Sequence, residues 1–389
     1  MKNNKISDES TTKHPRKIIY VFQGGGALGA FQVGGSKALS ENGYLADMVV
    51  GISIGGFNAA LIAGNPPEKR MERMQQFWDK VTVSIPFLDM SMAGMSKIHN
   101  YLGAQYALLF GQPGFYKPKI INPWLISNGK LEDFSFYDTS PVKDTLLELI
   151  DFDYLNEQHV RLCLGATDLE SGDFVFFDSS KEIITPEHIM ASGALPPGFP
   201  AVKINDRYYV DGGVYANTPL SKVLSEFADK ENDIDNVLCF MFDLFSAIGH
   251  LPHSMDGMME RIKDIQFSSH SKRRDKVYST SQNLSHAIRY LGTMLPEEVR
   301  NKPEVKDILK LGNAQRLDLV HIIYRSKKGT ELHSKDYNFS AETALVHSKL
   351  GYDITSELIE KEREKWDKIQ NEGTMIYTLE EGKIVETNI

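Results

Sequence analysis

The chain has 389 residues, with 43 basic and 52 acidic side chains and a net charge of −9. This acidic balance argues against general nucleic-acid binding. No stretch approaches the roughly 18 apolar residues that a membrane span needs, so the composition also argues against a transmembrane protein. A hydrophobic content of 41% is sufficient for a sizeable core.

The N-terminal segment favours a cytoplasmic protein. The first 17 residues lack the apolar core of a secretory signal, and residues 1–15 are expected to form a disordered tail. Peripheral membrane contact, and export without a signal peptide, remain open. Cys163 and Cys239 lie in apolar strand patterns, which predicts buried free thiols.

Hydrophobic periodicity predicts alternating strands and helices over the first 245 residues. The expected strands are residues 17–22, 46–50, 160–167, 173–178, 201–204, 207–210 and 236–243. The expected helices are residues 27–41, 54–63, 67–80, 141–150 and 186–193. This alternation indicates an α/β fold with a mostly parallel sheet covered on both faces. Beyond residue 250 the pattern is mainly helical, with one strand-like run at 317–325 and a long helix at 341–369.

A glycine loop follows the first strand. Lys17–Phe22 runs into the sequence Gln23-Gly24-Gly25-Gly26-Ala27-Leu28-Gly29, which begins a helix. Such a loop presents N–H groups that can hold a phosphate or an oxyanion. Gly24, Gly26 and Gly29 also match the dinucleotide fingerprint GxGxxG, so a nucleotide-binding protein is an alternative. That fingerprint expects an acidic residue after the next strand, but here this strand ends at Val50 and a serine turn follows.

That turn has the form of a nucleophile elbow, Gly51-Ile52-Ser53-Ile54-Gly55. A serine between a strand and a helix needs small residues at Gly51 and Gly55, because side chains there would collide with neighbouring backbone. The helix N-terminus that follows favours negative charge beside the hydroxyl. The pattern therefore suits acyl transfer, although a purely structural turn is the simpler alternative.

A third candidate is the aspartate after the strand Tyr208–Val210. Asp211 is followed by Gly212 and Gly213, which permit an abrupt turn. Reactive groups of open α/β sheets gather at strand ends, so Asp211 is expected to meet Ser53 and the glycine loop. An ordinary Asp-Gly turn is the alternative.

In this order, the three motifs resemble the patatin-like phospholipase family, acyl hydrolases that use a Ser-Asp dyad. Two further blocks carry the resemblance, namely Ala166–Leu169 with Ser171-Gly172, and Ala191–Pro196 with Phe199-Pro200. Many members have a basic residue where this chain has Leu28. The resemblance implies a three-layer catalytic domain over residues 16–245. Residues 246–389 look like the C-terminal extension of some bacterial members.

The resemblance also implies the site and its chemistry. Asp211 acts as general base for Ser53 without a histidine, and no metal or cofactor is required. The expected oxyanion hole is formed by N–H groups of Gly24, Gly25, Gly26 and Ile54. The expected reaction is the release of fatty acids from phospholipids or other lipid esters. Acyl transfer to another alcohol would use the same residues.

Two alternatives to a Ser-Asp hydrolase remain, a different catalytic mechanism and an inactive protein. A Ser-His-Asp triad would need a histidine that follows Asp211, and His321 and His333 are the candidates. His321 lies within an apolar strand pattern, which is unusual for a loop base. An inactive scaffold that recruits partners through its extension is the other alternative.

Three segments are candidates for contact with lipid or with a second chain. Residues 85–115 are rich in Met, Leu and Phe, including Met92 and Met95, and form either a lid or ordinary core. Residues 261–276 are basic and follow an apolar stripe that begins at Met255, as in a helix lying on anionic lipid, although a packed helix is the preferred interpretation. The extension also offers a surface for self-association.

Overall fold

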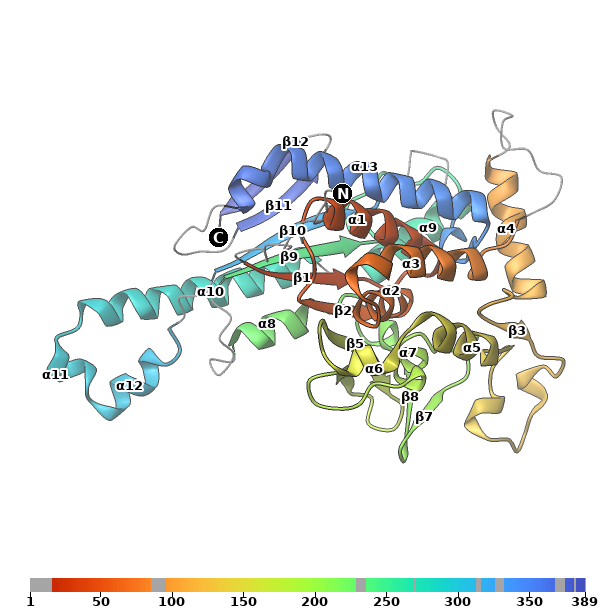
Figure 1. Cartoon of the computed structure of the whole chain (residues 1–389), viewed down its shortest axis with the longest axis horizontal. Coiled ribbons are helices and arrows are strands. Elements are labelled where there is room, and N and C mark those ends of the chain that lie inside the picture. Colours follow the sequence, from red (N-terminus) through yellow and green to blue (C-terminus); the bar gives the residue numbers. More distant parts are fainter. Residues whose placement is uncertain are drawn as a thin grey trace, which may run out of the picture.

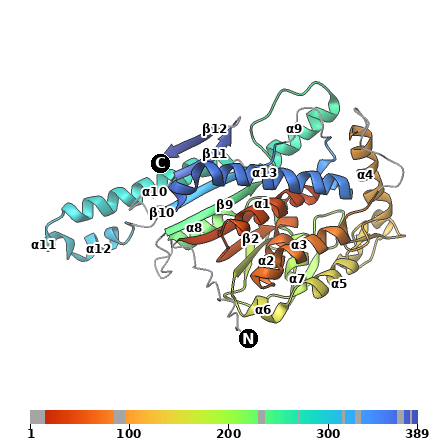
Figure 2. The same ribbon diagram turned by 45° about the horizontal axis from the view of Figure 1, so that its top comes forward.

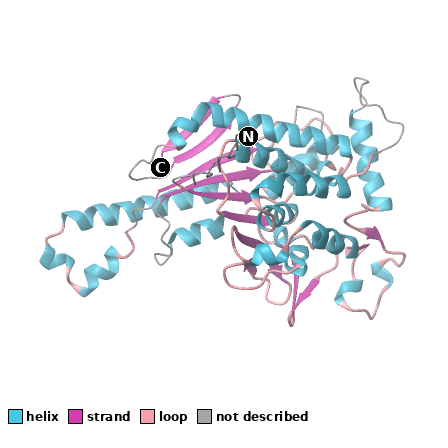
Figure 3. Ribbon diagram, in the orientation of Figure 1, coloured by secondary structure: helices cyan, strands magenta, loops and turns pink. Residues whose placement is uncertain are grey.

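The computed structural model describes residues 16–84, 96–228, 236–268, 271–312, 316–325, 332–367, 375–380 and 383–388. Figure 1 shows a central sheet with helices packed along it and a helical arm, formed by α10, α11 and α12, that projects from one end. Figure 3 shows the same arrangement by secondary structure.

The described strands of the main sheet lie in the order β12-β11-β10-β9-β1-β2-β5-β8-β7, and β6 pairs with β5. The strands β11, β10, β9, β1, β2 and β5 pair in parallel, whereas β12, β6, β8 and β7 pair antiparallel to their neighbours. Their bounds are β1 Lys17–Phe22, β2 Met48–Ile52, β5 Arg161–Asp168, β6 Phe174–Asp178, β7 Val202–Ile204, β8 Arg207–Asp211, β9 Asn236–Asp243, β10 Arg316–Ile323, β11 Met375–Glu380 and β12 Lys383–Asn388. A separate two-stranded ribbon joins β3 Lys117–Pro118 to β4 Tyr137–Asp138.

Helices cover both faces of the sheet. The α-helices are α1 Ala30–Glu41, α2 Ile54–Ala63, α3 Pro67–Val81, α4 Ser96–Phe110, α5 Ser140–Leu149, α6 Phe152–Asn156, α7 Pro186–Ser192, α8 Leu220–Ala228, α9 Met255–Phe267, α10 Ser271–Met294, α11 Glu297–Arg300, α12 Pro303–Leu309 and α13 Ala341–Trp366. The 3-10 turns are η1 Gly26–Gly29, η2 Pro123–Leu125, η3 Leu131–Asp133, η4 Gly212–Val214 and η5 Lys335–Tyr337.

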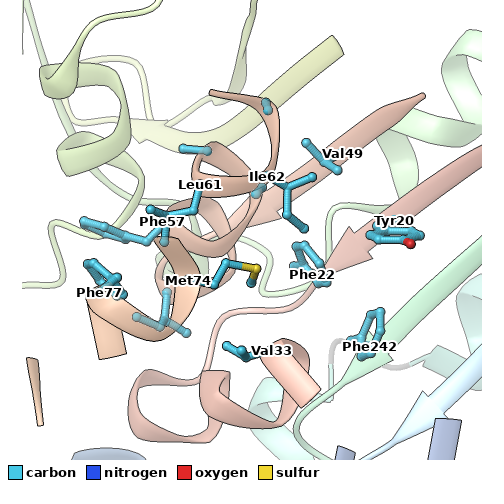
Figure 4. Close-up of a cluster of buried hydrophobic side chains, with 14 of the residues drawn as sticks. Tyr20, Phe22, Val33, Val49, Phe57, Leu61, Ile62, Met74, Phe77 and Phe242 are labelled. Atoms are coloured by element: carbon cyan, nitrogen blue, oxygen red, sulfur yellow. The ribbon is translucent and has the colours of Figure 1, made fainter. Parts of the chain in front are cut away.

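Alternating residues of β1 divide the core into two layers. Ile18, Tyr20 and Phe22 pack in the cluster that includes α1, α2 and α13, whereas Ile19 and Val21 pack with residues of α8. Successive strand side chains point to opposite faces, so this chain builds an α/β/α sandwich. Figure 4 shows part of the first layer, where Phe22 of β1 lies against Phe242 of β9, and Phe57 of α2 stacks on Phe77 of α3.

The predicted α/β class is confirmed, and each predicted strand and helix of the first 245 residues has a counterpart within a few residues. The strand-like run at 317–325 is β10, and the long helix is α13. Cys163 and Cys239 are buried and free, as predicted. Among the described residues, no helix is both long and apolar enough to cross a membrane.

Residues after 245 extend the sheet of the preceding segment. β10 pairs in parallel with β9 from Arg316 to Ile323, and α13 packs along α1, as Figure 2 shows. Arg16, just before β1, forms a buried ion pair of 2.8 Å with Asp318 of β10. The C-terminal part is thus predominantly helical, as predicted, but it also contributes strands to the common sheet.

Candidate active site

Ser53 lies between β2 and α2 in a strained turn. Its φ is 54° and its ψ is −133°, a conformation that non-glycine residues rarely adopt. Gly51 and Gly55 make this turn possible, since a Cβ on Gly51 would lie 2.3 Å from Gly55 O, and one on Gly55 would lie 2.5 Å from Phe22 O. The turn therefore has the geometry expected of a nucleophile elbow.

The segment Ser192–Ala194 holds the turn in place. The Ser53 N–H donates to Ser192 O at 3.0 Å, with Ser192 Oγ at 3.1 Å, and Ser192 Oγ donates to Gly165 O. The Asp211 N–H donates to Ala194 O at 3.0 Å. One segment therefore positions both predicted catalytic residues.

Asp211 reaches the level of Ser53 on an antiparallel strand. Ile52, the last residue of β2, pairs with Gly165 of β5, and Asp211 of β8 pairs with Ala166, the next residue of β5. β5 extends three residues beyond Gly165, to Asp168, and β8 pairs antiparallel with these three residues. The sequence interpretation anticipated a meeting at strand ends but not the reversed direction of β8.

The Asp211 carboxyl is buried, and its environment raises its pKa to about 7. Burial is the dominant cause, and it is partly offset by hydrogen bonds from the Gly213 N–H and the Ser53 hydroxyl. The Gly213 N–H donates to Oδ1 at 2.7 Å. Among the described residues, Oδ2 has no partner of normal hydrogen-bond geometry. The carboxyl therefore keeps one oxygen available for proton exchange beside Ser53.

The four predicted oxyanion donors separate into two groups. The Gly24 N–H donates to Asn217 O at 3.3 Å and is already occupied. Within the described part of the chain, the N–H groups of Gly25, Gly26 and Ile54 have no acceptor. Ile54 is the first residue of α2, so its N–H also carries the positive end of the helix dipole.

Sequence reasoning missed Asn217. Its Nδ2 donates to Gly24 O at 2.9 Å and to Phe267 O of α9 at 3.3 Å, and its backbone carbonyl accepts from Gly24. It therefore ties the glycine loop to the Asp211 loop and to α9. An asparagine six positions after Asp211 carries no periodic signal, so only the folded chain reveals this contact.

We expect Asn217→Ala to lower the free energy of unfolding by about 1–3 kcal/mol, because it leaves the buried Gly24 O without its side-chain donor. The acyl transfer predicted for Ser53 should slow about tenfold through kcat, which corresponds to about 1.4 kcal/mol in activation free energy. Urea unfolding and steady-state kinetics measure the two effects. Asn42→Ala removes a half-buried side chain whose hydrogen bonds, among the residues that the structure describes, are to Ala38 O and to Arg363 of α13, and it serves as the matched control. An unchanged kcat in Asn217→Ala would contradict this role.

The C-terminal part reaches the glycine loop. The Asp336 carbonyl of η5 lies directly against Gly26, and Phe267 O at the end of α9 accepts from Gln23 Nε2 at 2.9 Å. Lys263 of α9 holds η5 through a 2.7 Å ion pair with Asp336. Residues beyond 245 therefore support the loop that was predicted to bind the oxyanion.

The two candidate histidines have other carboxylate partners. His321 Nδ1 lies 2.8 Å from Asp243 Oδ2, on a strand separated from β2 by β9 and β1. His333 pairs with Asp256 of α9.

The other predicted segments are only partly described. Met92 and Met95 of the candidate lid lie outside the described residues, as do the side chains of Arg273 and Arg274, which belong to the basic segment 261–276. The apolar stripe of α9 is 45–77% exposed, whereas the helix packs through other residues, including Lys263 and Phe267. Its members are Met255, Met258, Met259, Ile262 and Ile265.

A small apolar pocket lies next to the segment that positions the two catalytic candidates. Gly193 and Ala194 form part of its wall, and the remaining lining residues are Phe57, Phe115, Thr139, Val142, Met190, Phe199 and Val202. This wall is suited to hydrocarbon.

The fold and the site together define an α/β protein with a serine elbow, an adjacent buried carboxyl and a glycine loop. A sequence model of the family described as "Patatin-like phospholipase" matches residues 20–224, and one described as "Patatin phospholipase" matches residues 265–371. The first match covers more than half of the chain, so the chain belongs to the patatin-like phospholipase family, a family of lipid hydrolases. The predicted family is confirmed.

The chain spans only a small part of the length of the curated relatives that it matches, and a larger part of the similar solved structures. Patatin-like phospholipase domain-containing protein 6 of Mus musculus, and that of Homo sapiens, are each 40% identical over 76 residues, which is 19% of this chain and 6% of those proteins. VipD of Legionella pneumophila is 15% identical with a TM-score of 0.40, over 90% of this chain and 67% of VipD. Human GIVD cytosolic phospholipase A2 is 10% identical with a TM-score of 0.42, over 90% of this chain and 59% of that structure.

Proposed function

We propose that this chain is a serine acyl hydrolase that releases fatty acids from phospholipids or other lipid esters through an acyl-Ser53 intermediate. The observation that supports this most directly is the buried Asp211 carboxyl beside the Ser53 hydroxyl, at the N-terminus of α2. Membership of the patatin-like phospholipase family supports the lipid substrate.

The first half-reaction forms the acyl-enzyme. The Asp211 carboxylate accepts the Ser53 proton while Oγ bonds to the ester carbonyl carbon. The resulting oxyanion is stabilised by N–H groups of Gly25, Gly26 and Ile54, each worth about 10²–10³ in rate. The carbon–oxygen bond to the alcohol then breaks, and Asp211 returns the proton to the departing oxygen.

Water completes the reaction by the same route. Asp211 accepts a proton from a water that attacks the acyl-Ser53 carbonyl, and the fatty acid leaves as Ser53 recovers its proton. We place the acyl group along the apolar pocket, because Gly193 and Ala194 line it and directly follow Ser192, which bonds the Ser53 turn. No step requires a histidine, and the partners of His321 and His333 are consistent with this.

We propose residues 16–245 as the catalytic domain and residues 246–389 as an extension that completes it. The support is β10 in the common sheet, together with the contacts of Phe267 and Asp336 at the glycine loop. This arrangement predicts that a chain cut at residue 245 would lose both a sheet neighbour of β9 and the cover of Gly26.

The direct test is to incubate the full chain with phospholipid vesicles in the presence of a chelator and to identify the products. We expect free fatty acid and lysophospholipid in equal amounts. A parallel titration with NAD and ATP tests the nucleotide-binding alternative. Saturable nucleotide binding without ester cleavage would reject the hydrolase, and absence of both activities would favour the scaffold.

A further inference from the structure

The glycine loop is fixed through its carbonyl groups. In a trans peptide the C=O and the N–H point in opposite directions, so a bond to the carbonyl sets the direction of the next residue's N–H. Asn217 Nδ2 donates to Gly24 O at 2.9 Å and thereby orients the Gly25 N–H. The Leu28 N–H donates to Gly25 O at 3.1 Å and orients the Gly26 N–H. Both N–H groups that the proposed reaction assigns to the oxyanion are therefore aimed by a bond at the other end of the same peptide.

The peptide that precedes these two is held by a buried side chain of α1. Gln32 Nε2 donates to Gln23 O at 2.7 Å. Gln23 O shares its peptide with the Gly24 N–H, where the glycine loop begins. A Cβ on Gly24 would lie 3.0 Å from the Ser53 Cβ, so the loop passes directly against the proposed nucleophile at this point. A rotation of this peptide would move the start of the loop relative to Ser53.

A side chain of α2 continues the network. Asn58 Nδ2 donates to Gln32 Oε1 at 2.9 Å and to Gly29 O at 3.0 Å. Asn58 lies on α2, the helix that begins directly after Ser53. The two amides therefore connect both ends of the glycine loop to the helix whose N-terminus positions Ser53.

The direction of the bonds in this network is determined by the chemistry of its two ends. Trp78 Nε1 of α3 can only donate, and it donates to Asn58 Oδ1 at 3.1 Å. Asn58 must then turn its NH2 group toward Gln32. Gln32 in turn must direct its own NH2 group at the Gln23 carbonyl, which can only accept. An indole at one end and a carbonyl at the other thus leave one arrangement for both amides, and this arrangement favours a single position of the loop.

Gln32 and Asn58 are fully buried within the larger apolar layer of the core. Val33 and Phe57, their neighbours in the chain, belong to that layer, as Figure 4 shows. A buried amide is costly unless its donors and acceptor are satisfied, and apolar side chains of similar size would fill the same space. The two amides are therefore explained by the loop carbonyls that they bind rather than by packing.

We propose that Gln32 and Asn58 are positioning residues that hold the glycine loop with its N–H groups directed toward the ester oxyanion. Their hydrogen-bond partners are loop carbonyls, Trp78 and each other, so both residues act through the loop. The effect on catalysis rests on the proposed function, whereas the hold on the loop is independent of it.

A trifluoromethyl ketone with an alkyl chain tests the direction of the N–H groups in the full chain. Its carbonyl carbon bonds to Ser53 Oγ, the hydroxyl proton passes to Asp211, and the carbonyl oxygen becomes an oxyanion, so no group leaves. Fluorine NMR should show this adduct on the wild type and not on Ser53→Ala. Inhibition of the cleavage of a soluble ester gives the affinity of the ketone.

Gln32→Met removes the donor to Gln23 O and keeps a side chain of similar length. We expect kcat for the soluble ester and the affinity for the ketone each to fall about tenfold, with KM within about twofold. Donors aimed at the oxyanion bind the transition state and its analogue more strongly than they bind the ground state. A role in stability alone would not separate kcat from KM in this way.

Asn65→Leu is the matched control. Asn65 is a buried amide that follows α2 at its other end, and it donates to Leu61 O at 3.0 Å and to Leu149 O at 2.9 Å. Its replacement should lower the urea midpoint about as much as Gln32→Met does, because each removes a buried amide donor. It should leave kcat and the ketone affinity unchanged.

Trp78→Phe is the milder variant and keeps the proposal testable if Gln32→Met does not fold. It removes the donor that fixes the direction of Asn58, and it keeps an aromatic ring against Phe339. We expect a loss of about threefold in kcat and in ketone affinity, since one hydrogen bond of the network is lost and the bonds to the loop carbonyls remain.

Equal losses of kcat in Gln32→Met and Asn65→Leu would show that activity follows stability, and would overturn the positioning role. Full ketone affinity in a folded Gln32→Met would do the same, and where that variant does not fold, full affinity in Trp78→Phe would do so. If the wild type forms no adduct and cleaves no ester, the proposed function fails, and deuterium exchange of residues 23–31 decides the inference. Faster exchange in Gln32→Met but not in Asn65→Leu would support the hold on the loop, and unchanged exchange would reject it.

Discussion

Replacing Ser53 by alanine is expected to lower fatty-acid release by about 10⁴-fold or more, to the background rate. In the proposed reaction the hydroxyl oxygen bonds to the substrate, and the remaining oxyanion donors cannot form an acyl intermediate. Release of fatty acid from vesicles by the wild type and the variant measures the effect. Alanine has no larger side chain, so the turn held by Ser192 should persist.

A fluorophosphonate provides the covalent test of the same residue. Intact mass should show one adduct on the wild type and none on Ser53→Ala. Ser171→Ala is the matched control, because Ser171 lies exposed in the turn between β5 and β6 and should leave labelling and turnover intact. Labelling that survives in Ser53→Ala, or turnover that persists, would contradict the assignment of the nucleophile.

Asp211→Asn should lower turnover by about 10²–10⁴-fold while making the fold more stable above neutral pH. The amide cannot accept the Ser53 proton, which removes general-base catalysis. Its oxygen can still accept the Gly213 N–H, which now bonds Oδ1 at 2.7 Å. The structural hydrogen bond is therefore kept and the proton acceptor is lost. Asp206→Asn, in the exposed turn before β8, is the matched control.

The raised pKa of Asp211 predicts how the proposed reaction of the wild type depends on pH. Because the carboxyl must be ionised to act as base, kcat/KM should rise about tenfold per pH unit up to about pH 7 and then level off. Measurement with a soluble ester avoids titrating the lipid headgroups. A profile that stays flat between pH 5 and 9 would exclude Asp211 as the base.

Ionisation of Asp211 has opposite effects on stability and on activity. As pH rises through its pKa, the free energy of unfolding should fall while kcat/KM rises. A carboxyl whose pKa is about 7 when folded and 3.8 in its ordinary state holds its proton more tightly in the folded chain, so its contribution to stability is lost as pH rises through this window. The neutral asparagine avoids that loss. We expect Asp211→Asn to exceed the wild type by roughly 2–4 kcal/mol in unfolding free energy at pH 8, with a smaller difference at pH 5.

Urea unfolding at both pH values tests the linkage. A difference between variant and wild type that is the same at pH 5 and pH 8 would mean that burial does not raise the pKa of this carboxyl. The measurement is independent of substrate, so it also applies if the proposed reaction is wrong.

The sequence by itself determined the local elements and the motif residues. Strand and helix periods are properties of short windows, and the glycines around Ser53 are required by a turn only five residues long. The order of the glycine loop, the elbow and Asp211 was enough to predict the family, and the family match confirms it. The roles of Ser53 and Asp211 remain proposals.

Only the tertiary structure decided how distant segments meet at this site. β8 runs antiparallel to β5, Asn217 joins Gly24 to Phe267, and β10 continues the sheet beside β9. These contacts depend on strand order and on the burial of backbone groups that any sequence carries, so no local pattern reports them. Burial also sets the charge state of Asp211, because desolvation acts only once the chain is folded.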